Sequence, residues 1–504
     1  MSGKPALRFT LSEKTANKLR KSLTRNLKRV RGERIALINT YFDSPHHILY
    51  KAGFILRLTS TKNKRILALK VPAILAESAQ GHTQISIPST HNGPSLNLFK
   101  DTALGPTIKR WRRDIKLQPY FEVHCDRRVL ELKSATSQIE FTFDCGHIES
   151  NTGPKKKVEP VSEMRMQLIK GDPLELQDLA LKLSEEYDLQ REHLTKADRG
   201  FQLTRPTNRK GPVTSRGVEL DTALTVGEAF GRIVHESLDH LYKNEKSTLK
   251  SHPKGVHQTR VAIRRLRAAL RAFKDCLPYD KRKAFNGEFR WFQQRFGPAR
   301  DWHVFMSESL PQIKEHNGGE QVYMNLRKLA LKERRLATKE TVRLMQTKRY
   351  ARLLLQFEKW ITILERSTTG YLNQPIAPFA YSVLHRAQQE LLLETRPLTR
   401  ITGEQLHEIR KRGKKLRYAA EFFSEICSDD AFEVLLELKT FQDYLGQAND
   451  AKTAVQILAA LDPANVKSED LSFVRTWADG RLQECARGAQ PIWRHLHRTQ
   501  PFSF

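Results

Sequence analysis

The chain has 504 residues, of which 39% are hydrophobic and 28% charged, so it can bury large apolar cores and is not an intrinsically disordered chain. Its formal net charge of +30 points to a polyanionic partner, whether nucleic acid, an acidic membrane surface or a phosphate polymer. Five scattered cysteines without a CxxC pair argue against disulfides and zinc fingers, and are typical of reduced thiols in the cytoplasm.

The N-terminus shows no membrane signal. The sequence has no run of 18 apolar residues, and no hydrophobic signal core follows Met1, so we expect a cytoplasmic protein without membrane insertion. The first 34 residues hold 11 Lys and Arg against 2 Asp and Glu, as an organellar transit peptide can. A strand followed by a helix explains them better, because Ala6–Leu11 alternates and Ser12 can cap the next helix.

Residues 6–204 are rich in strand patterns. Alternation of apolar and polar residues predicts strands at Ile55–Thr59, Arg65–Val71, His82–Ile87, Phe121–Leu132 and Ile139–Phe143. Leucines at helical spacing predict a helix over Pro173–Tyr187.

Beyond this region the strand patterns stop. The segment TRPTNRKGPVTSRG is polar, with two prolines and two glycines, and predicts a linker over 205–216 between domains at 1–204 and 217–504. Helical periodicity then predicts helices at Val218–Leu241, His257–Phe273, Lys283–Phe296, Tyr323–Thr347, Ala377–Leu393, Glu404–Ile426, Ala431–Leu445 and Asp450–Leu461. The fold class is therefore multidomain α+β, with an all-α C-terminal domain.

One predicted helix is strongly one-sided. At 100° per residue, one sector of about 80° collects five basic side chains, namely His257, Arg260, Arg264, Arg267 and Arg271. Apolar side chains fill the neighbouring sector. Like charges at this spacing destabilise a helix unless an anion neutralises them, so the row predicts an anion-binding surface rather than a solvated face.

This helix belongs to an internal repeat. The pattern His257-x-x-Arg260-x-x-x-Arg264-Arg265-Leu266-Arg267 recurs 150 residues later as His407-x-x-Arg410-x-x-x-Lys414-Lys415-Leu416-Arg417. Downstream, Phe292-Gln293-x-x-Phe296-Gly297-x-Ala299-x-Asp301 recurs as Phe441-Gln442-x-x-Leu445-Gly446-x-Ala448-x-Asp450. Duplication predicts two similar helical bundles, at about 217–365 and 375–500, whose basic helices face one another across a pseudo-two-fold axis.

Several roles stay open at these positions. His257 and His407 either contact phosphate or bond a neighbouring helix, whereas a metal ion would be repelled by the surrounding guanidinium groups. Asp301 and Asp450 are expected just after a tight turn, where each either caps a helix or holds an arginine of the basic row. Nucleic acid is a weaker partner than a featureless polyanion, because aromatic platforms are missing from 257–271 and only Tyr418 follows the second cluster.

The duplicated helices and their Gly-x-Ala-x-Asp segments resemble the CHAD domain (conserved histidine α-helical domain) over about residues 217–495. The resemblance implies two four-helix bundles around a basic pore that binds inorganic polyphosphate and can direct proteins to polyphosphate granules. It carries phosphate contacts over to His257, Arg260, Arg264, Arg265, Arg267, His407, Arg410, Lys414, Lys415 and Arg417. Arg271 is a peripheral contact, because Glu421 stands at the matching position of the second copy.

The N-terminal region resembles the CYTH (triphosphate tunnel) domain. The landmarks are Tyr41-Phe42-Asp43-Ser44-Pro45, Lys51-Ala52-Gly53, Leu56-Arg57, Leu69-Lys70, Asp144-x-Gly146 and Lys196-Ala197-Asp198-Arg199-Gly200-Phe201. They imply an antiparallel eight-stranded β-barrel, or tunnel, whose lumen holds triphosphate. The potential phosphate contacts are Arg57, Lys70, Arg127 and Arg128.

The chain departs from the acidic pattern of that family. Where the family opens with Glu-x-Glu-x-Lys, this chain has Ala6-Leu7-Arg8-Phe9-Thr10, and a later Glu-x-Glu run is Glu163-Met164-Arg165. Strand 82–87 has no acid at all. Because triphosphate hydrolysis needs carboxylates to hold Mg²⁺ or Mn²⁺, metal affinity should collapse. We expect an inactive barrel, or at most a second anion-binding domain.

The sequence therefore predicts a non-enzymatic polyphosphate-binding protein of the cytoplasm, associated with polyphosphate granules. It predicts no cofactor, no metal ligand and no catalytic residue, and other phosphate-rich polyanions are further possible partners. An inorganic triphosphatase acting through the N-terminal barrel is the alternative, and nucleic-acid binding is the third hypothesis.

Overall fold

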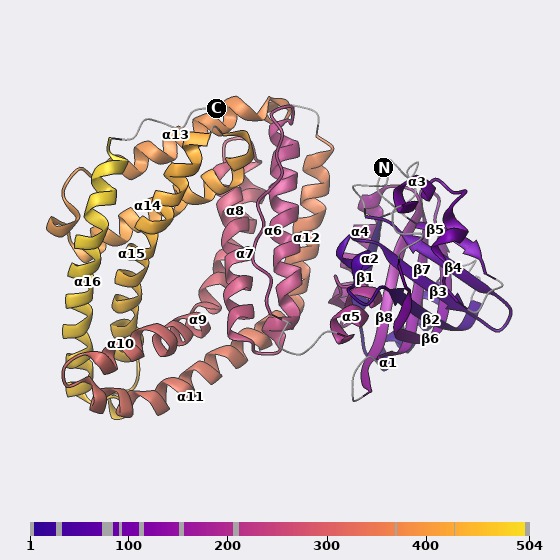
Figure 1. Ribbon diagram of the computed structural model, residues 1–504, viewed down its shortest axis with the longest axis horizontal. Helices are drawn as coiled ribbons and strands as arrows, with labels where there is room; N and C mark the ends of the chain where they lie inside the picture. Colours follow the sequence, from indigo (N-terminus) through magenta and orange to yellow (C-terminus); the bar gives the residue numbers. More distant parts are fainter. Residues whose placement is uncertain are drawn as a thin grey trace. The chain divides into compact units, whose positions relative to one another are not determined.

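A computed structural model describes residues 5–26, 33–72, 84–89, 93–109, 115–150, 156–204, 211–367, 370–427 and 429–498 (Figure 1). The chain forms two compact units, one of residues 1–210 with 348–359 and one of residues 211–347 with 360–504. The described part of the expected linker, 211–216, has neither helix nor strand. Among the described helices, none combines the length and the apolar character needed to cross a bilayer.

The first unit contains an antiparallel sheet. Its strands are β1 (Ala6–Thr10), β2 (Glu33–Asp43), β3 (Ile55–Ser60), β4 (Arg65–Lys70), β5 (Gln84–Pro88), β6 (Gln118–Lys133), β7 (Gln138–Ser150), β8 (Lys157–Lys170) and β9 (Gln190–Arg191). They pair in the order β5-β4-β3-β2-β6-β7-β8-β1-β9.

The sheet is not closed within the described residues, so the expected barrel is corrected to an open antiparallel sheet. The strands at its two ends are short: β5 has five residues and β9 has two. Such short strands offer few backbone groups with which to close a cylinder. Residues 82 and 83 of the expected strand 82–87 lie outside the described residues.

Short helices complete this unit, namely α1 (Glu13–Asn26), α2 (Ile48–Lys51), α3 (Gly105–Ile108), α4 (Pro173–Glu186) and α5 (Lys196–Thr204). Asp172 caps α4 by accepting the amide hydrogen of Leu174, and Pro173 supplies the first helical residue. Side chains of α1 and α4, such as Leu19 and Leu176, share a buried core with Phe9 of β1.

Helix α5 lies so close to β6 that there is no room for a side chain at Gly200. A Cβ on Gly200 would lie 2.0 Å from the ring of Phe121. We expect Gly200→Ala to lower the stability of the first unit by roughly 1–3 kcal/mol, because the helix must move off the sheet. Hydrogen–deuterium exchange of α5 and β6 in the full chain measures this. Gly93→Ala, where a Cβ meets nothing within 4 Å, is the control, and equal exchange in both variants would contradict the prediction.

The second unit is helical. Its helices are α6 (Val226–Leu249), α7 (Pro253–Ala272), α8 (Tyr279–Arg295), α9 (Gly297–Val304), α10 (Leu310–Glu315), α11 (Gly319–Met345), α12 (Lys348–Glu365, whose last residues belong here), α13 (Ile376–Leu392), α14 (Gly403–Phe423), α15 (Asp429–Ala459) and α16 (Ser468–Leu496). Figure 1 shows α6, α7 and α8 side by side, and α14, α15 and α16 likewise.

The repeat has one asymmetry that the sequence pattern did not predict. In the first copy, the chain breaks between α8 and α9, and Pro298 lies in the first turn of the new helix. In the second copy, α15 runs unbroken through Gly446 and Asp450, so the two expected helices there are one and the expected turn is wrong. Proline lacks a backbone N–H and favours a helix start, whereas Gln447 at the matching position continues the helix.

The two repeats share a core. Trp302 of α9 and Leu326 of α11 pack in one buried cluster with Ala454 of α15 and Trp477 of α16. Helices of the first copy are therefore covered by helices of the second, so the spacing of the two copies is fixed by apolar contacts.

Candidate functional site

Two basic rows lie on α7 and α14, and these helices contact one another. The row of α7 consists of His257, Arg260, Arg264, Arg267 and Arg271, and the row of α14 consists of His407, Arg410, Lys414 and Arg417. Pro253 begins α7. Thr402 caps α14 through a capping box, in which its hydroxyl accepts the amide hydrogen of Gln405. All row residues are half-buried, as they should be when stems cover apolar surface and charged ends stay accessible.

In the first repeat, Arg260 is held from behind. Its Nη1 donates to the backbone carbonyls of Phe296 (3.0 Å) and Gly297 (2.6 Å), and lies 3.8 Å from Oδ1 of Asp301. Burial lowers the pKa of Arg260 to about 10, although Asp301 opposes the shift. This arginine is fixed in place by the segment that the repeat duplicates.

The second repeat uses the same plan. Arg410 interacts electrostatically with Asp450, and burial is the main cause that lowers the pKa of Arg410. Nδ1 of His407 lies 3.1 Å from Oδ1 of Asn449, next to that aspartate. A hydrogen bond to a neighbouring helix was one of the two roles left open for this histidine.

The aspartates are partners of arginine rather than caps. Helix α9 has Phe296 at its N-cap and Asp301 four residues inside, while Asp450 lies in the middle of α15. Burial raises the pKa of both aspartates, and the charge of Asp450 also raises that of Asp301. They are therefore close together, each beside one arginine of a row.

The rows meet at Arg264. Its Nε donates to the hydroxyl of Tyr418 on α14, and Arg264 and Arg417 lie 5.6 Å and 4.5 Å from the centre of that ring. Burial lowers the pKa of Lys414 to about 6, with further lowering by Arg264, Arg410 and Arg417. Cations of both copies thus converge where the two helices meet.

Glutamines of the duplicated Phe-Gln pairs orient one arginine in each row. Nη1 of Arg267 donates to Oε1 of Gln293 (2.9 Å), and Nε of Arg417 donates to Oε1 of Gln442 (3.0 Å). Burial lowers the pKa of Arg267 to about 10. Arg271 follows on α7, while Glu421 at the matching place on α14 binds Arg417. The two rows therefore differ in charge at this end.

Two sequence-predicted contacts point elsewhere. Arg265 is buried, lies 3.3 Å from Glu421 and 5.2 Å from the centre of the Phe422 ring. Lys415 donates to Oε1 and Oε2 of Glu390 at 2.7 Å and 2.6 Å. Each follows a row residue by one position, which turns it about 100° away on the helix, so they join helices rather than extend the rows.

Other cations near the rows were missed by the sequence pattern. Arg300 lies close enough to His257 to affect its charge. Burial is the main cause that lowers the pKa of His257 to about 3, and the positive charges of Arg300 and Arg264 add to this shift. A cavity of about 360 Å³ beside the start of α7 is lined in part by His303 and Arg334. His303 and Arg334 do not belong to a repeated motif, and they lie beside α7 only because α9 and α11 pack near it.

The sheet of the first unit carries a second basic cluster. Arg8 and Arg165 are paired across β1 and β8, although like charges at such positions destabilise a sheet. The pKa of Lys70 is lowered, mainly because burial removes part of its hydration. The positive charges of Arg8, Arg165 and Arg57 lower it further. The Nε atoms of Arg57 and Arg165 are buried, and neither has a hydrogen-bond partner among the described residues. This basic face suits an anion.

Two acids that remain near this face, Asp144 and Glu163, are already paired with cations. Arg127 donates to both oxygens of Asp144 at 2.7 Å and 2.8 Å, and Lys196 lies 2.9 Å from Asp144 and bonds Glu163. Lys196 therefore occupies both carboxylates. Paired in this way, Asp144 and Glu163 do not fit the divalent cation that triphosphate hydrolysis requires.

Arg128 does not share the basic face. Successive residues of a strand point to opposite sides, and Arg127 is turned toward Asp144. Arg128 instead interacts with Asp126, which Arg34 binds on the other side of the sheet. Among the four expected contacts of the sheet, Arg57, Lys70 and Arg127 share one face and Arg128 does not.

Comparisons with known proteins match both units. A CYTH domain model matches residues 7–201 and a CHAD domain model matches residues 232–459. The CHAD domain of the plant Ricinus communis is 26% identical with a TM-score of 0.50, over 58% of this chain and 99% of that one. PptA from Streptomyces chartreusis is 15% identical with a TM-score of 0.42, over 54% of this chain and 99% of that one.

One curated relative is an inorganic triphosphatase of Haemophilus influenzae. It is 26% identical over 176 residues, which are 34% of this chain and 47% of that protein. The match therefore spans about half the length of that relative.

Proposed function

Because the chain joins a CYTH domain at residues 7–201 to a CHAD domain at residues 232–459, we propose that it binds inorganic polyphosphate along the facing rows of α7 and α14. The observation that carries the proposal is the position of Arg264, which bonds Tyr418 of α14 and interacts with Arg410 and Lys414. Cations from two helices converge there, and the acids Asp301 and Asp450 lie beside Arg260 and Arg410, respectively.

Polyphosphate matches this surface in charge and in shape. It is a linear chain that repeats one anionic group and offers no bases to read. Arginine forks bind phosphate oxygens in pairs, and lysine adds a point charge. A row of about 20 Å along α7 can contact several successive phosphates. Binding a long granule polymer in this way supports a location at polyphosphate granules.

A salt-titrated binding series with polyphosphates of increasing length tests the proposal. We expect affinity to fall linearly with salt on logarithmic axes, as counterions are released by analogy with DNA. The slope should steepen with chain length and then level off once the chain outgrows the site. Displacement of labelled polyphosphate by single-stranded or duplex DNA at equal phosphate concentration would favour nucleic acid as the partner instead.

The alternative function is hydrolysis of triphosphate by the CYTH domain, and the triphosphatase relative favours testing it. We expect no phosphate release from triphosphate with Mg²⁺ or Mn²⁺. Lys196 is bound to the carboxylates of Asp144 and Glu163, and Arg8 takes the place of an acid of the family pattern. Triphosphate should still bind to Arg8, Arg57 and Arg165. Metal-dependent phosphate release that survives in an Arg264→Glu variant would establish the enzyme.

A further inference from the structure

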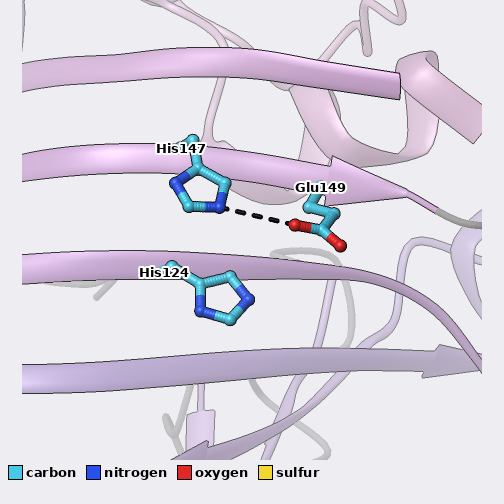
Figure 2. A group of neighbouring side chains, drawn as sticks. All are labelled: His124, His147 and Glu149. Atoms are coloured by element: carbon cyan, nitrogen blue, oxygen red, sulfur yellow. Dashed lines mark ion pairs between the residues drawn. The ribbon is translucent and has the colours of Figure 1, made fainter. Parts of the chain in front are cut away.

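We propose that the CYTH domain carries a zinc site on the side of the sheet opposite its basic face, formed by His124, His147 and Glu149. One nitrogen or oxygen of each residue lies within 4.8 Å of the others (Figure 2). The three residues come from the adjacent strands β6 and β7, and all are partly exposed. The sequence predicted no metal ligand in this chain.

Strand register builds this group. His124 pairs directly with His147, and Glu122 pairs directly with Glu149, so two imidazoles and two carboxylates form a square on one face. The imidazole rings are stacked, with centres 4.9 Å apart. Gly146 permits the close approach, since a Cβ there would lie 1.9 Å from the carbonyl oxygen of His124.

The two carboxylates of this group lie directly opposite one another on the two strands. Like charges directly opposite one another on a sheet destabilise it. Lys156 lies 2.6 Å from one oxygen of Glu149, which leaves the other oxygen 3.5 Å from Nε2 of His147 (Figure 2). Glu122 binds Nε2 of His124 at 3.0 Å. A divalent cation between the imidazoles would offset the repulsion between the two carboxylates.

The ligand types suit zinc. Two imidazole nitrogens with one carboxylate oxygen are a known zinc set, with bonds of about 2.0–2.2 Å. Such bonds place the ligand atoms about 3.3 Å apart, so modest side-chain rotation closes the group around the ion. Lys156 holds the carboxylate as an outer partner.

Three protein ligands leave one zinc position open. Both histidines line a cavity of about 470 Å³, together with Lys62, Asp126 and Cys145. Water or a small ligand can therefore reach the fourth position. This site is separate from the polyphosphate rows, and its test does not depend on them.

The site is tested by measuring zinc binding to the full-length, metal-free chain. Polyphosphate is left out of this assay because it binds divalent cations itself. The probes are Zn²⁺ in competition with a colorimetric chelator, and Co²⁺ followed by the visible absorption of tetrahedral cobalt. We expect one Zn²⁺ per chain, and at least a 100-fold weaker affinity, as an order of magnitude, in His124→Gln/His147→Gln.

Two further variants keep the test sharp. His316→Gln removes an exposed histidine of the second unit and should change nothing. Glu149→Gln alone should weaken zinc binding roughly 10- to 100-fold, and serves if the double variant fails to fold. Equal zinc affinity in the wild type and Glu149→Gln, or absence of the cobalt bands from the wild type, would overturn the proposal.

Discussion

An Arg264→Glu/Lys414→Glu variant should bind polyphosphate roughly 10²- to 10⁴-fold more weakly than the wild type. Hydrogen bonds to charged groups are worth about 1.5–3 kcal/mol each, and each 1.4 kcal/mol is tenfold in affinity. Both side chains lie where the rows of α7 and α14 converge. Reversal removes two contacts and adds repulsion toward phosphate. Fluorescence anisotropy with labelled polyphosphate at fixed salt measures the loss.

The fold should survive this double reversal. The new carboxylates would lie near Arg260, Arg410 and Arg417, which now repel the guanidinium of Arg264 and lower the pKa of Lys414. The melting temperature without polyphosphate should therefore stay unchanged or rise.

Arg412→Glu is the matched control. It makes the same charge change on α14, but residue 412 lies about 180° around the helix from the centre of the row. Its polyphosphate affinity should change by no more than a general electrostatic effect. If the double variant and this control lose affinity equally, the contact surface is not the pair of rows.

Binding of polyphosphate should carry close to one proton onto Lys414. The pKa of its ammonium group is lowered to about 6 by burial and by Arg264, Arg410 and Arg417, so at pH 7.5 the lysine is mostly neutral. A bound polyanion favours the charged form and raises this pKa. Affinity should therefore rise as pH falls from 8 toward 6, by up to tenfold per unit, and level off below 6.

Calorimetry in two buffers of different ionisation enthalpy counts these protons. Long polyphosphate chains are used because they have few terminal phosphates, whose own titration would add to the count. Lys414→Arg stays charged throughout, so its proton uptake should drop by nearly one while binding remains. The free protein supplies a second readout. A lysine pKa lowered on folding means that the unfolded chain binds more protons, so stability should rise with pH above 6. Identical proton uptake in wild type and Lys414→Arg would contradict the assignment.

The residues of one helix face could be predicted from spacing alone. Helical periodicity placed His257, Arg260 and Arg264 on one side of α7, and the repeat placed their counterparts on α14. The same arithmetic also separates Arg265 and Lys415 from the rows, but the family pattern carried them over as phosphate contacts. Their partners, Glu421 and Glu390, come from other helices and depend on how those helices pack.

Long-range placement was beyond the reach of the sequence. Arg300 reaches the first row only through the packing of α9, and no motif marks it. His124 and His147 are 23 positions apart and match no metal-binding spacing, since only the register of β6 and β7 sets them side by side. Arg128 shows the reverse error, because a run of two arginines in a strand must divide between its two faces.

The core shared by the repeats bears on how the chain is made. Trp302 and Leu326 lack their partners until Ala454 and Trp477 have been synthesised, about 130 residues after α11 ends. At about 5–20 residues per second, the ribosome needs roughly 7–26 s for that length. During this interval the nascent first repeat exposes an apolar surface beside a dense row of cations. A chaperone, or the polyanion itself, has time to meet it before the second repeat closes the core.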